Sequence, residues 1–250
     1  MIAVHELVKR YGQFTAVDGI SLDVKRGEIH GFLGPNGAGK TTTIRMIAGL
    51  LKPTSGRITV NDHDLAGNPE GAKSSLGFIP DRPYIYEKLT AGEFLRFHAG
   101  LYGVEDSSVD QRVRDMLELF ELLRWEHELV ESFSHGMKQR LVMSAAFLHR
   151  PDAVLVDEPM VGLDPRGAKL IKAVFRRMSE RGAAILMSTH TLEVAQEMCD
   201  RISIILRGKI IASGTVDELN ALAGDTDAAL TPVFLKLTGG SAIQEIDEVL

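Results

Sequence analysis

The residues from Gly34 to Thr41 read Gly-Pro-Asn-Gly-Ala-Gly-Lys-Thr, a complete G-x-x-x-x-G-K-[ST] phosphate-binding loop. Its glycines let the backbone curl so that successive N–H groups point at phosphate oxygens. Lys40 would bring a positive charge to the β- and γ-phosphates, and the Thr41 hydroxyl would ligate Mg²⁺. The alternative is a glycine-rich turn that binds nothing. We expect a nucleotide to contact Gly34, Pro35, Asn36, Gly37, Ala38, Gly39, Lys40, Thr41 and Thr42.

Two carboxylates, Asp157 and Glu158, follow the apolar run Ala153–Val156. Ligands bind at the carboxyl ends of strands in open α/β sheets. Consecutive strand residues point to opposite sides, but at a frayed strand end both can turn toward the site. We expect Asp157 to hold Mg²⁺ and Glu158 to accept a proton from an attacking water. A solvated acidic strand end is the alternative interpretation.

Two further polar segments lie at positions where they could contact a phosphate, one at a strand end and one at the start of a helix. His190 follows the apolar run that ends at Thr189, and its neutral imidazole could donate to a γ-phosphate. Ser134 is a good N-cap for the helix that it precedes, and Gly136 leaves the N–H groups of the first turn exposed. A structural histidine and ordinary helix capping are the alternatives.

The elements that must position these residues alternate between strand and helix. Glu28–Leu33 is a plausible buried strand that runs into the loop, and Thr41–Leu51 is the helix that follows. Ala153–Val156 and Ala183–Met187 are unbroken apolar runs, the pattern of parallel strands covered on both faces. A helix over Gly167–Arg181 separates them and completes a βαβ unit.

Other segments differ in pattern from this α/β core. The first 30 residues predict short antiparallel strands, broken at Tyr11-Gly12 and Asp18-Gly19. Residues 90–150 have helical periodicity, and we expect the members of the repeating set to form helix core. That set is Phe94, Phe97, Leu101, Val113, Met116, Leu117 and Phe120. We expect one domain over 1–223, with an α/β core over about 1–80 and 151–223, a helical insertion over about 90–150, and an extension over 224–250.

Composition limits the class of protein. The chain has 250 residues, 44% of them hydrophobic, and a formal charge of −6, which argues against a nucleic-acid binder. No run approaches the roughly 18 apolar residues that span a bilayer, and the N-terminus lacks a signal-peptide pattern. Cys199, the single cysteine, is most simply a small buried hydrophobe and fits a reducing compartment. We expect a cytoplasmic location.

Together these motifs resemble those of the ATP-binding subunit of ABC transporters over essentially the whole chain. The resemblance implies an α/β P-loop NTPase (RecA-like) core with an N-terminal antiparallel β-subdomain and an inserted α-helical subdomain. Gly34–Thr41 corresponds to the Walker A loop, and Asp157 and Glu158 correspond to the Walker B pair. Gly162–Asp164 corresponds to the D-loop, and His190 to the switch histidine. ATP and Mg²⁺ are the implied cofactors.

The resemblance extends to adenine binding and to a dimer. It implies that Tyr11 stacks on adenine, with an ordinary strand tyrosine as the alternative. Ser134–Gln139 stands at the position of the family signature, which usually reads L-S-G-G-Q. The corresponding residues here are Phe133–Met137: Ser134 and Gly136 are kept, His135 replaces the first glycine and Met137 replaces the glutamine. In the family two subunits, identical or related, pair head to tail, and each signature caps the γ-phosphate bound by the other chain. Met160-Val161 replaces the usual polar pair before the D-loop.

One departure falls beside the expected metal site. After the strand that ends at Pro80 the family normally places a glutamine that reaches Mg²⁺ and the attacking water, and this chain has Asp81. A carboxylate is a better ligand for a hard cation than an amide. Asp81 either binds Mg²⁺ through water or caps the turn, and the sequence leaves both open.

Two functional classes share these motifs, a transporter motor and a soluble ATPase. Only 94 positions separate Lys40 from Ser134, without the long coiled coil of the DNA-repair type, whereas the iron–sulfur assembly type is compatible with this length. Arg82–Thr90 gathers aromatic and aliphatic side chains that could receive a helix of an integral membrane permease, or could pack locally. The motifs, together with Val233–Gly240, resemble bacterial exporters with a separate permease. We therefore expect attachment to the inner face of the membrane through that permease.

Overall fold

The computed structural model describes residues 1–82, 84–223, 230 and 234. The strands are β1 (Ile2–Tyr11), β2 (Phe14–Val24), β3 (Ile29–Leu33), β4 (Ser55–Val60), β5 (His63–Asp64), β6 (Leu76–Ile79), β7 (Ala153–Asp157), β8 (Ala184–Thr189), β9 (Arg201–Leu206) and β10 (Lys209–Gly214). The α-helices are α1 (Lys40–Ile47), α2 (Pro69–Ser74), α3 (Ala91–Leu101), α4 (Asp106–Leu119), α5 (His135–Phe147), α6 (Pro165–Glu180), α7 (Leu192–Met198) and α8 (Val216–Ala223). Two short 3₁₀ turns, η1 (Leu123–Trp125) and η2 (Val130–Ser132), precede α5.

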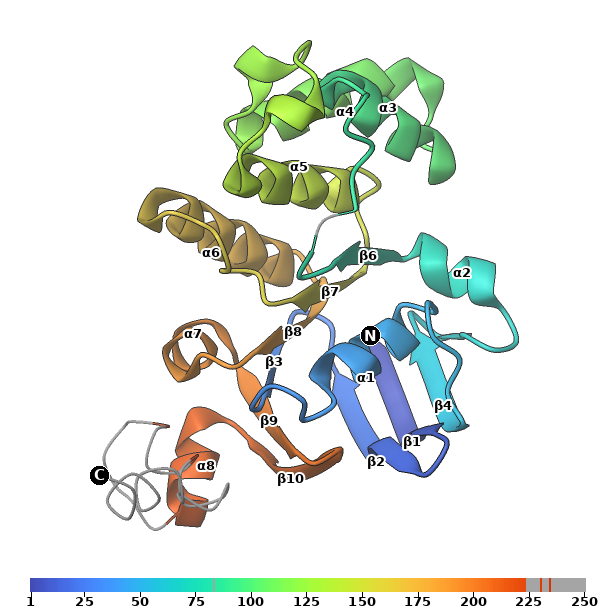
Figure 1. Cartoon of the computed structure of the whole chain (residues 1–250), viewed down its shortest axis with the longest axis vertical. Coiled ribbons are helices and arrows are strands. Elements are labelled where there is room, and N and C mark those ends of the chain that lie inside the picture. The colour runs from blue at the N-terminus through green and yellow to red at the C-terminus, as the bar shows by residue number, and fades with distance from the viewer. Residues whose placement is uncertain (83, 224–229, 231–233, 235–250) are drawn as a thin grey trace.

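A mostly parallel sheet forms the centre of the molecule, and in the described residues its strand order is β10-β9-β3-β8-β7-β6. β3 lies between β8 and β9 and is parallel to both, whereas β10 is an antiparallel edge strand. Every residue of β3, β7 and β8 is buried. The apolar runs predicted this burial, because helices or a second sheet cover both faces (Figure 1).

A second, antiparallel sheet in the order β2-β1-β4-β5 packs with α1 against one face of the central sheet. The predicted break at Asp18-Gly19 is wrong, because β2 continues from Phe14 to Val24. The pairing with β1 passes from Leu7↔Ile20 to Val8↔Asp18, so Gly19 is an extra residue in the strand. Gly19 has a φ of +71°, which suits glycine in a bulge, and the turn signal therefore marks a bulge inside one strand.

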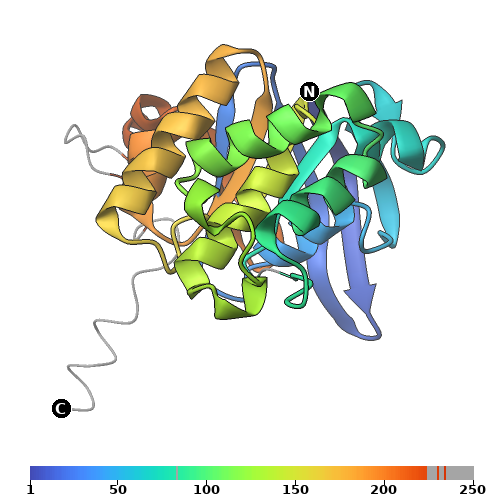
Figure 2. The same cartoon turned by 90° about the horizontal axis from the view of Figure 1, so that it is seen from above.

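The helical insertion covers the other side of the central sheet and contains α3, α4 and α5 (Figure 2). Thr90 begins α3 with a capping box, in which its hydroxyl accepts from the Glu93 N–H. Two expected core positions are wrong, because Phe97 is 43% exposed and Leu101 is 64% exposed. Both residues continue the three- and four-residue spacing from Phe94, which is buried as expected. The buried face of α3 is formed by Ala91, Phe94, Leu95 and Ala99, and it does not include Phe97 or Leu101.

Two smaller expectations also have structural outcomes. The loop helix α1 ends at Ile47, four residues before the predicted end. Gly49, with φ of +68°, follows its C-terminal cap and stops the helix as glycines often do. Cys199 is buried as expected, and burial raises the pKa of its thiol to about 12. The thiol is therefore an unreactive part of the core.

Candidate nucleotide-binding site

The glycine-rich loop connects the carboxyl end of β3 to the first turn of α1. A side chain at Gly34 would place its Cβ 2.4 Å from the Ile205 carbonyl oxygen, and one at Gly39 would place it 2.7 Å from the Ala16 carbonyl oxygen. Gly37, with φ of +80°, faces open space instead. The loop therefore packs closely against β2 and β9 on one side and is open on the other side. This arrangement leaves its backbone N–H groups accessible to phosphate oxygens.

Lys40 extends beneath this loop and is only 6% exposed. Its Nζ donates to the carbonyl oxygens of Gly34 (2.7 Å) and Pro35 (3.2 Å) and lies 3.9 Å from Oε1 of Glu158. Burial lowers the pKa of Lys40, while the carboxylates of Glu158 and Asp157 oppose that shift. One cation therefore joins the loop to the carboxylate pair at the end of β7.

Asp157 is the last residue of β7 and is buried. It lies opposite Ser188 of β8 in the parallel register, and the Ser188 hydroxyl donates to its Oδ1. Sequence reasoning missed Ser188. The available signal was a polar residue at the end of an apolar strand, and the pairing register with Asp157 gives it a role.

Glu158 has a φ of +54°, a left-handed conformation that is uncommon for a residue with a side chain. Its backbone N–H donates to the Ser188 carbonyl (3.2 Å), which holds the turn. Its Oε1 accepts from Nδ1 of His190 at 2.9 Å. The break in strand alternation explains how two consecutive carboxylates reach one site, as the sequence required.

The structure also places the remaining nucleotide and metal candidates of this chain. Tyr11 ends β1 and is 50% exposed, with Lys9 Nζ 5.2 Å from the centre of its ring. Thr41 and Thr42 lie partly exposed in the first turn of α1. Asp81 follows β6 and is also partly exposed, and within the described part of the chain its side chain has no hydrogen bond or ion pair.

Comparison with known proteins decides the family. Residues 17–161 match the sequence profile of the family described as "ABC transporter". The chain belongs to the ABC transporter family. It is 39% identical over 232 residues to the linearmycin resistance ATP-binding protein LnrL of Bacillus subtilis, covering 92% of this chain and 75% of that one. It is 38% identical over 251 residues to the ABC-type transporter ATP-binding protein EcsA of the same species, covering 98% and 99%.

A solved structure described as the ATP-binding subunit of an ABC transporter supports the same conclusion. It superposes with a TM-score of 0.90 at 35% identity, covering 95% of this chain and 99% of that one. The expected P-loop NTPase fold is therefore confirmed. The chain is an ATP-binding, ATP-hydrolysing subunit of an ABC transporter. Within the described residues, every helix is too short or too polar to cross a membrane.

The signature of this ABC subunit begins α5, away from its own Walker A loop. Ser134 caps α5 and accepts from the Met137 N–H at 3.4 Å. In Figure 1, α5 lies in the helical layer, well separated from α1. Ser134 and Gly136 therefore do not lie beside Lys40 of the same chain.

The signature instead contacts the D-loop of the same chain. A Cβ at Gly162 would lie only 2.2 Å from Cδ2 of His135, and one at Gly136 would lie 3.2 Å from the Gly162 carbonyl oxygen. The His135 ring thus covers the Cα of Gly162. This contact belongs to the residue that departs from the family signature.

Proposed function

We propose that this subunit binds Mg-ATP between its Walker A loop and the signature of a second ATPase subunit, and uses hydrolysis to drive export through a separate membrane permease. The observation that carries the hydrolytic part is the position of Glu158. Its Oε1 lies 2.9 Å from Nδ1 of His190 and 3.9 Å from Nζ of Lys40. A carboxylate held between the phosphate-binding lysine and a second polar side chain suits a general base for attacking water.

The residues beside the loop fit a magnesium ion bound together with ATP. Mg²⁺ prefers oxygen ligands and keeps several of its waters, so a protein usually supplies only one or two oxygen donors. Thr41 at the start of α1 and Asp157 at the end of β7 would supply them, and the hydroxyl of Ser188 keeps Asp157 oriented. Asp81 is a further candidate, through water. When bound, the ion would neutralise charge on the β- and γ-phosphates.

The remaining groups divide the work of hydrolysis between them. Lys40 would leave its carbonyl partners for phosphate oxygens, to which it offers a full positive charge. Glu158 would accept the proton of the attacking water. His190, 48% exposed at its side chain, would use its ring proton either to hold Glu158 through Nδ1–H or to donate to the γ-phosphate through Nε2–H. Tyr11 would stack on the adenine.

A second ATPase subunit, identical or related, would complete the site. Ser134 and Gly136 are at the exposed start of a 13-residue helix, where N–H groups and the helix dipole favour a phosphate. Because α5 lies away from α1 in the same chain, the phosphate that it caps would be bound by the partner (Figure 1). We therefore assign Ser134 and Gly136 to ATP binding across the dimer.

The permease would dock beside Tyr84 and Tyr86, which are 85% and 59% exposed. Below them is an apolar pocket of about 220 Å³ between the central sheet and the helical insertion, lined by Phe78, Pro80 and Tyr84 among others. Within the Arg82–Thr90 segment, Ile85 and Leu89 pack on the core. Local packing therefore explains those two side chains. Tyr86 meets the Phe97 ring edge-on, but both tyrosines keep most of their surface exposed and available to a short permease helix.

The direction of transport and the location of this subunit both depend on the permease to which it binds. LnrL is named a resistance protein, which supports outward transport by this relative. We propose the same direction here, with the chain held at the cytoplasmic face of the membrane through its permease. We also retain a single ATPase domain over 1–223. Apart from Leu230 and Phe234, the 224–250 extension, with Val233–Gly240, lies outside the described residues.

The Glu158→Gln variant tests the hydrolytic proposal. The amide keeps the size of the side chain but cannot take a proton, so we expect turnover to fall about 100-fold or more. ATP should still bind, and ATP-dependent dimers should accumulate in size-exclusion chromatography. Glu193→Gln, an exposed acid of α7, is the matched control and should hydrolyse ATP normally. Unchanged hydrolysis in Glu158→Gln would show that another group is the base.

A further inference from the structure

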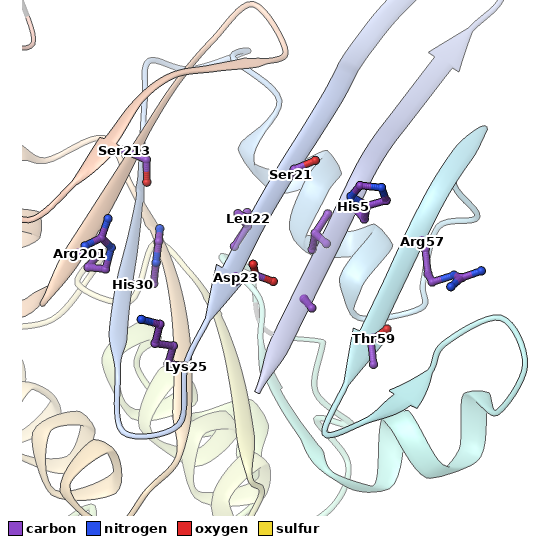
Figure 3. Close-up of a pocket in the computed structure, with 12 residues that line it drawn as sticks. His5, Ser21, Leu22, Asp23, Lys25, His30, Arg57, Thr59, Arg201 and Ser213 are labelled. Atoms are coloured by element: carbon purple, nitrogen blue, oxygen red, sulfur yellow. The ribbon is translucent and has the colours of Figure 1, made fainter.

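A polar hollow of about 520 Å³ lies near the start of β3, at the end of that strand opposite the Walker A loop. Figure 3 shows two walls that face it. Residues of β1, β2 and β4 form one wall, and the other contains Lys25, His30, Arg201 and Ser213. The Walker residues are not part of its lining, so the hollow is separate from the nucleotide site.

Positive charge predominates in this hollow. Lys25 and Arg201 lie on one wall and Arg57 on the other, whereas Asp23 is the only acidic residue among the described lining residues. Within the described part of the chain, the Lys25 ammonium has no ion pair. Arg201 reaches Glu218 at 3.3 Å and Arg57 reaches Asp64 at 3.8 Å, but all four side chains are more than a third exposed, so both pairs are weak. The hollow therefore suits an anion.

A hydrogen-bonded chain runs from the core into the same hollow. Nδ1 of His30 lies 2.9 Å from Oε1 of Glu28, and Nε2 lies 2.8 Å from the Ser203 hydroxyl. That hydroxyl in turn lies 2.9 Å from the hydroxyl of Ser213, which lines the hollow. Glu28, His30 and Ser203 are all buried, and the hydrogen bond from His30 helps to lower the pKa of Glu28 against the opposing effect of burial.

The hydroxyls of Ser203 and Ser213 can hydrogen-bond in either direction. If Nε2 of His30 accepts from Ser203, Ser213 must donate inward to Ser203. If Nε2–H donates to Ser203, Ser203 donates to Ser213, and the Ser213 hydrogen is free to point into the hollow. A ligand that accepts from Ser213 without breaking the chain therefore requires the form in which Nε2 donates.

We propose that this hollow binds a small multivalent oxyanion, held by Lys25 and Arg201 and by a hydrogen bond from Ser213. That bond leaves the hydroxyl chain intact when Nε2 of His30 donates to Ser203. The charged groups near His30 are Glu28, Arg201 and Lys25 on its own wall, with Asp23 on the facing wall. The proposal does not depend on the chemistry at the nucleotide site.

Inorganic pyrophosphate, titrated by calorimetry into ADP-saturated protein, tests the proposal. ADP keeps the Walker A loop filled. We expect binding to weaken at least tenfold in Lys25→Ala and in Arg201→Gln, and to tighten in Asp23→Asn, which removes the opposing charge. Lys169→Gln, which removes an exposed charge outside the hollow, should stay within twofold. Absence of binding to the unaltered protein, or equal weakening in Lys169→Gln, would overturn the site.

The Ser213 hydroxyl has its own measurement in the same calorimetric titration. Ser213→Ala should bind pyrophosphate more weakly than the unaltered protein, while circular dichroism confirms that each variant is folded. Equal affinity of Ser213→Ala and of the unaltered protein would contradict the role of the hydroxyl chain.

Discussion

At the scale of single residues, the site depends on one uncommon backbone conformation. A left-handed residue with a side chain costs roughly 1–3 kcal/mol, and such strain persists only where neighbours hold it. At Glu158 the neighbours are the Ser188 carbonyl, His190 and Lys40. The strain brings the carboxylate toward the lysine, which is the arrangement that the chemistry needs.

Lys40 gives the first prediction at this scale. Lys40→Ala removes the buried cation that phosphate oxygens would otherwise meet, and hydrogen bonds to charged groups contribute about 1.5–3 kcal/mol. We expect ATP affinity in isothermal titration calorimetry to fall at least tenfold. Arg45→Ala removes an exposed charge from the same helix and is the control. Equal affinity of Lys40→Ala and the control would remove Lys40 from the site.

His149 gives a prediction on stability against pH. It stacks on Tyr102 with ring centres 3.8 Å apart, and burial lowers its pKa from 6.5 to about 4. Because the folded protein disfavours the charged ring, His149 contributes its full stabilisation only at pH values above 6.5, the pKa in the unfolded chain. That contribution is lost as pH falls from 6.5 toward 4, by about 3 kcal/mol in total. Urea unfolding should show a smaller loss over this range in His149→Phe than in the exposed control His127→Phe.

At the scale of elements, the sequence predicted the strands whose position is determined by a single local pattern. The apolar runs before Gly34, Asp157 and His190 all became buried parallel strands. Failures came where a single pattern had two structural outcomes: Gly19 makes a bulge and not a turn, and Phe97 satisfies helical spacing but faces outward. Pairing between distant segments, such as Ser188 with Asp157, depends on the register of the sheet, which one sequence pattern does not contain.

The contact between α5 and the D-loop gives the prediction at this scale. Gly162→Ala would place a Cβ 2.2 Å from the His135 ring and would also strain a φ of +78°. We expect a lower melting temperature than in Gly12→Ala, where φ is +57° and nothing lies within 4 Å. Adding His135→Ala should restore part of the loss, because the clash disappears while the backbone strain remains. If the melting temperature of the double variant did not recover, the His135 ring would not be the cause of the clash at residue 162.

At the scale of the whole molecule, the two hydrophobic cores meet on opposite faces of β3. Phe32 belongs to the core beneath the antiparallel sheet, whereas Ile29 and Leu33 belong to the core beneath the helical insertion. The strand ends in the Walker A loop, so both layers are packed directly against the element that holds the phosphates (Figure 1). The helical layer also contains the signature and, together with Tyr84, lines the apolar pocket at the proposed permease site. Nucleotide, partner subunit and permease would therefore act on one connected body.

Tyr84 tests how that body connects to its permease. Tyr84→Asp places a charge on a side chain that is 85% exposed, so folding and ATP binding should not change. The charge would have to be buried against an apolar permease helix, which is costly without a partner. We therefore expect the variant to lose co-purification with an integral membrane protein in detergent extracts. Leu222→Asp, at a site 66% exposed on α8, is the matched control and should retain its partner. Retention of the partner by both variants would show that Tyr84 is not part of the docking surface.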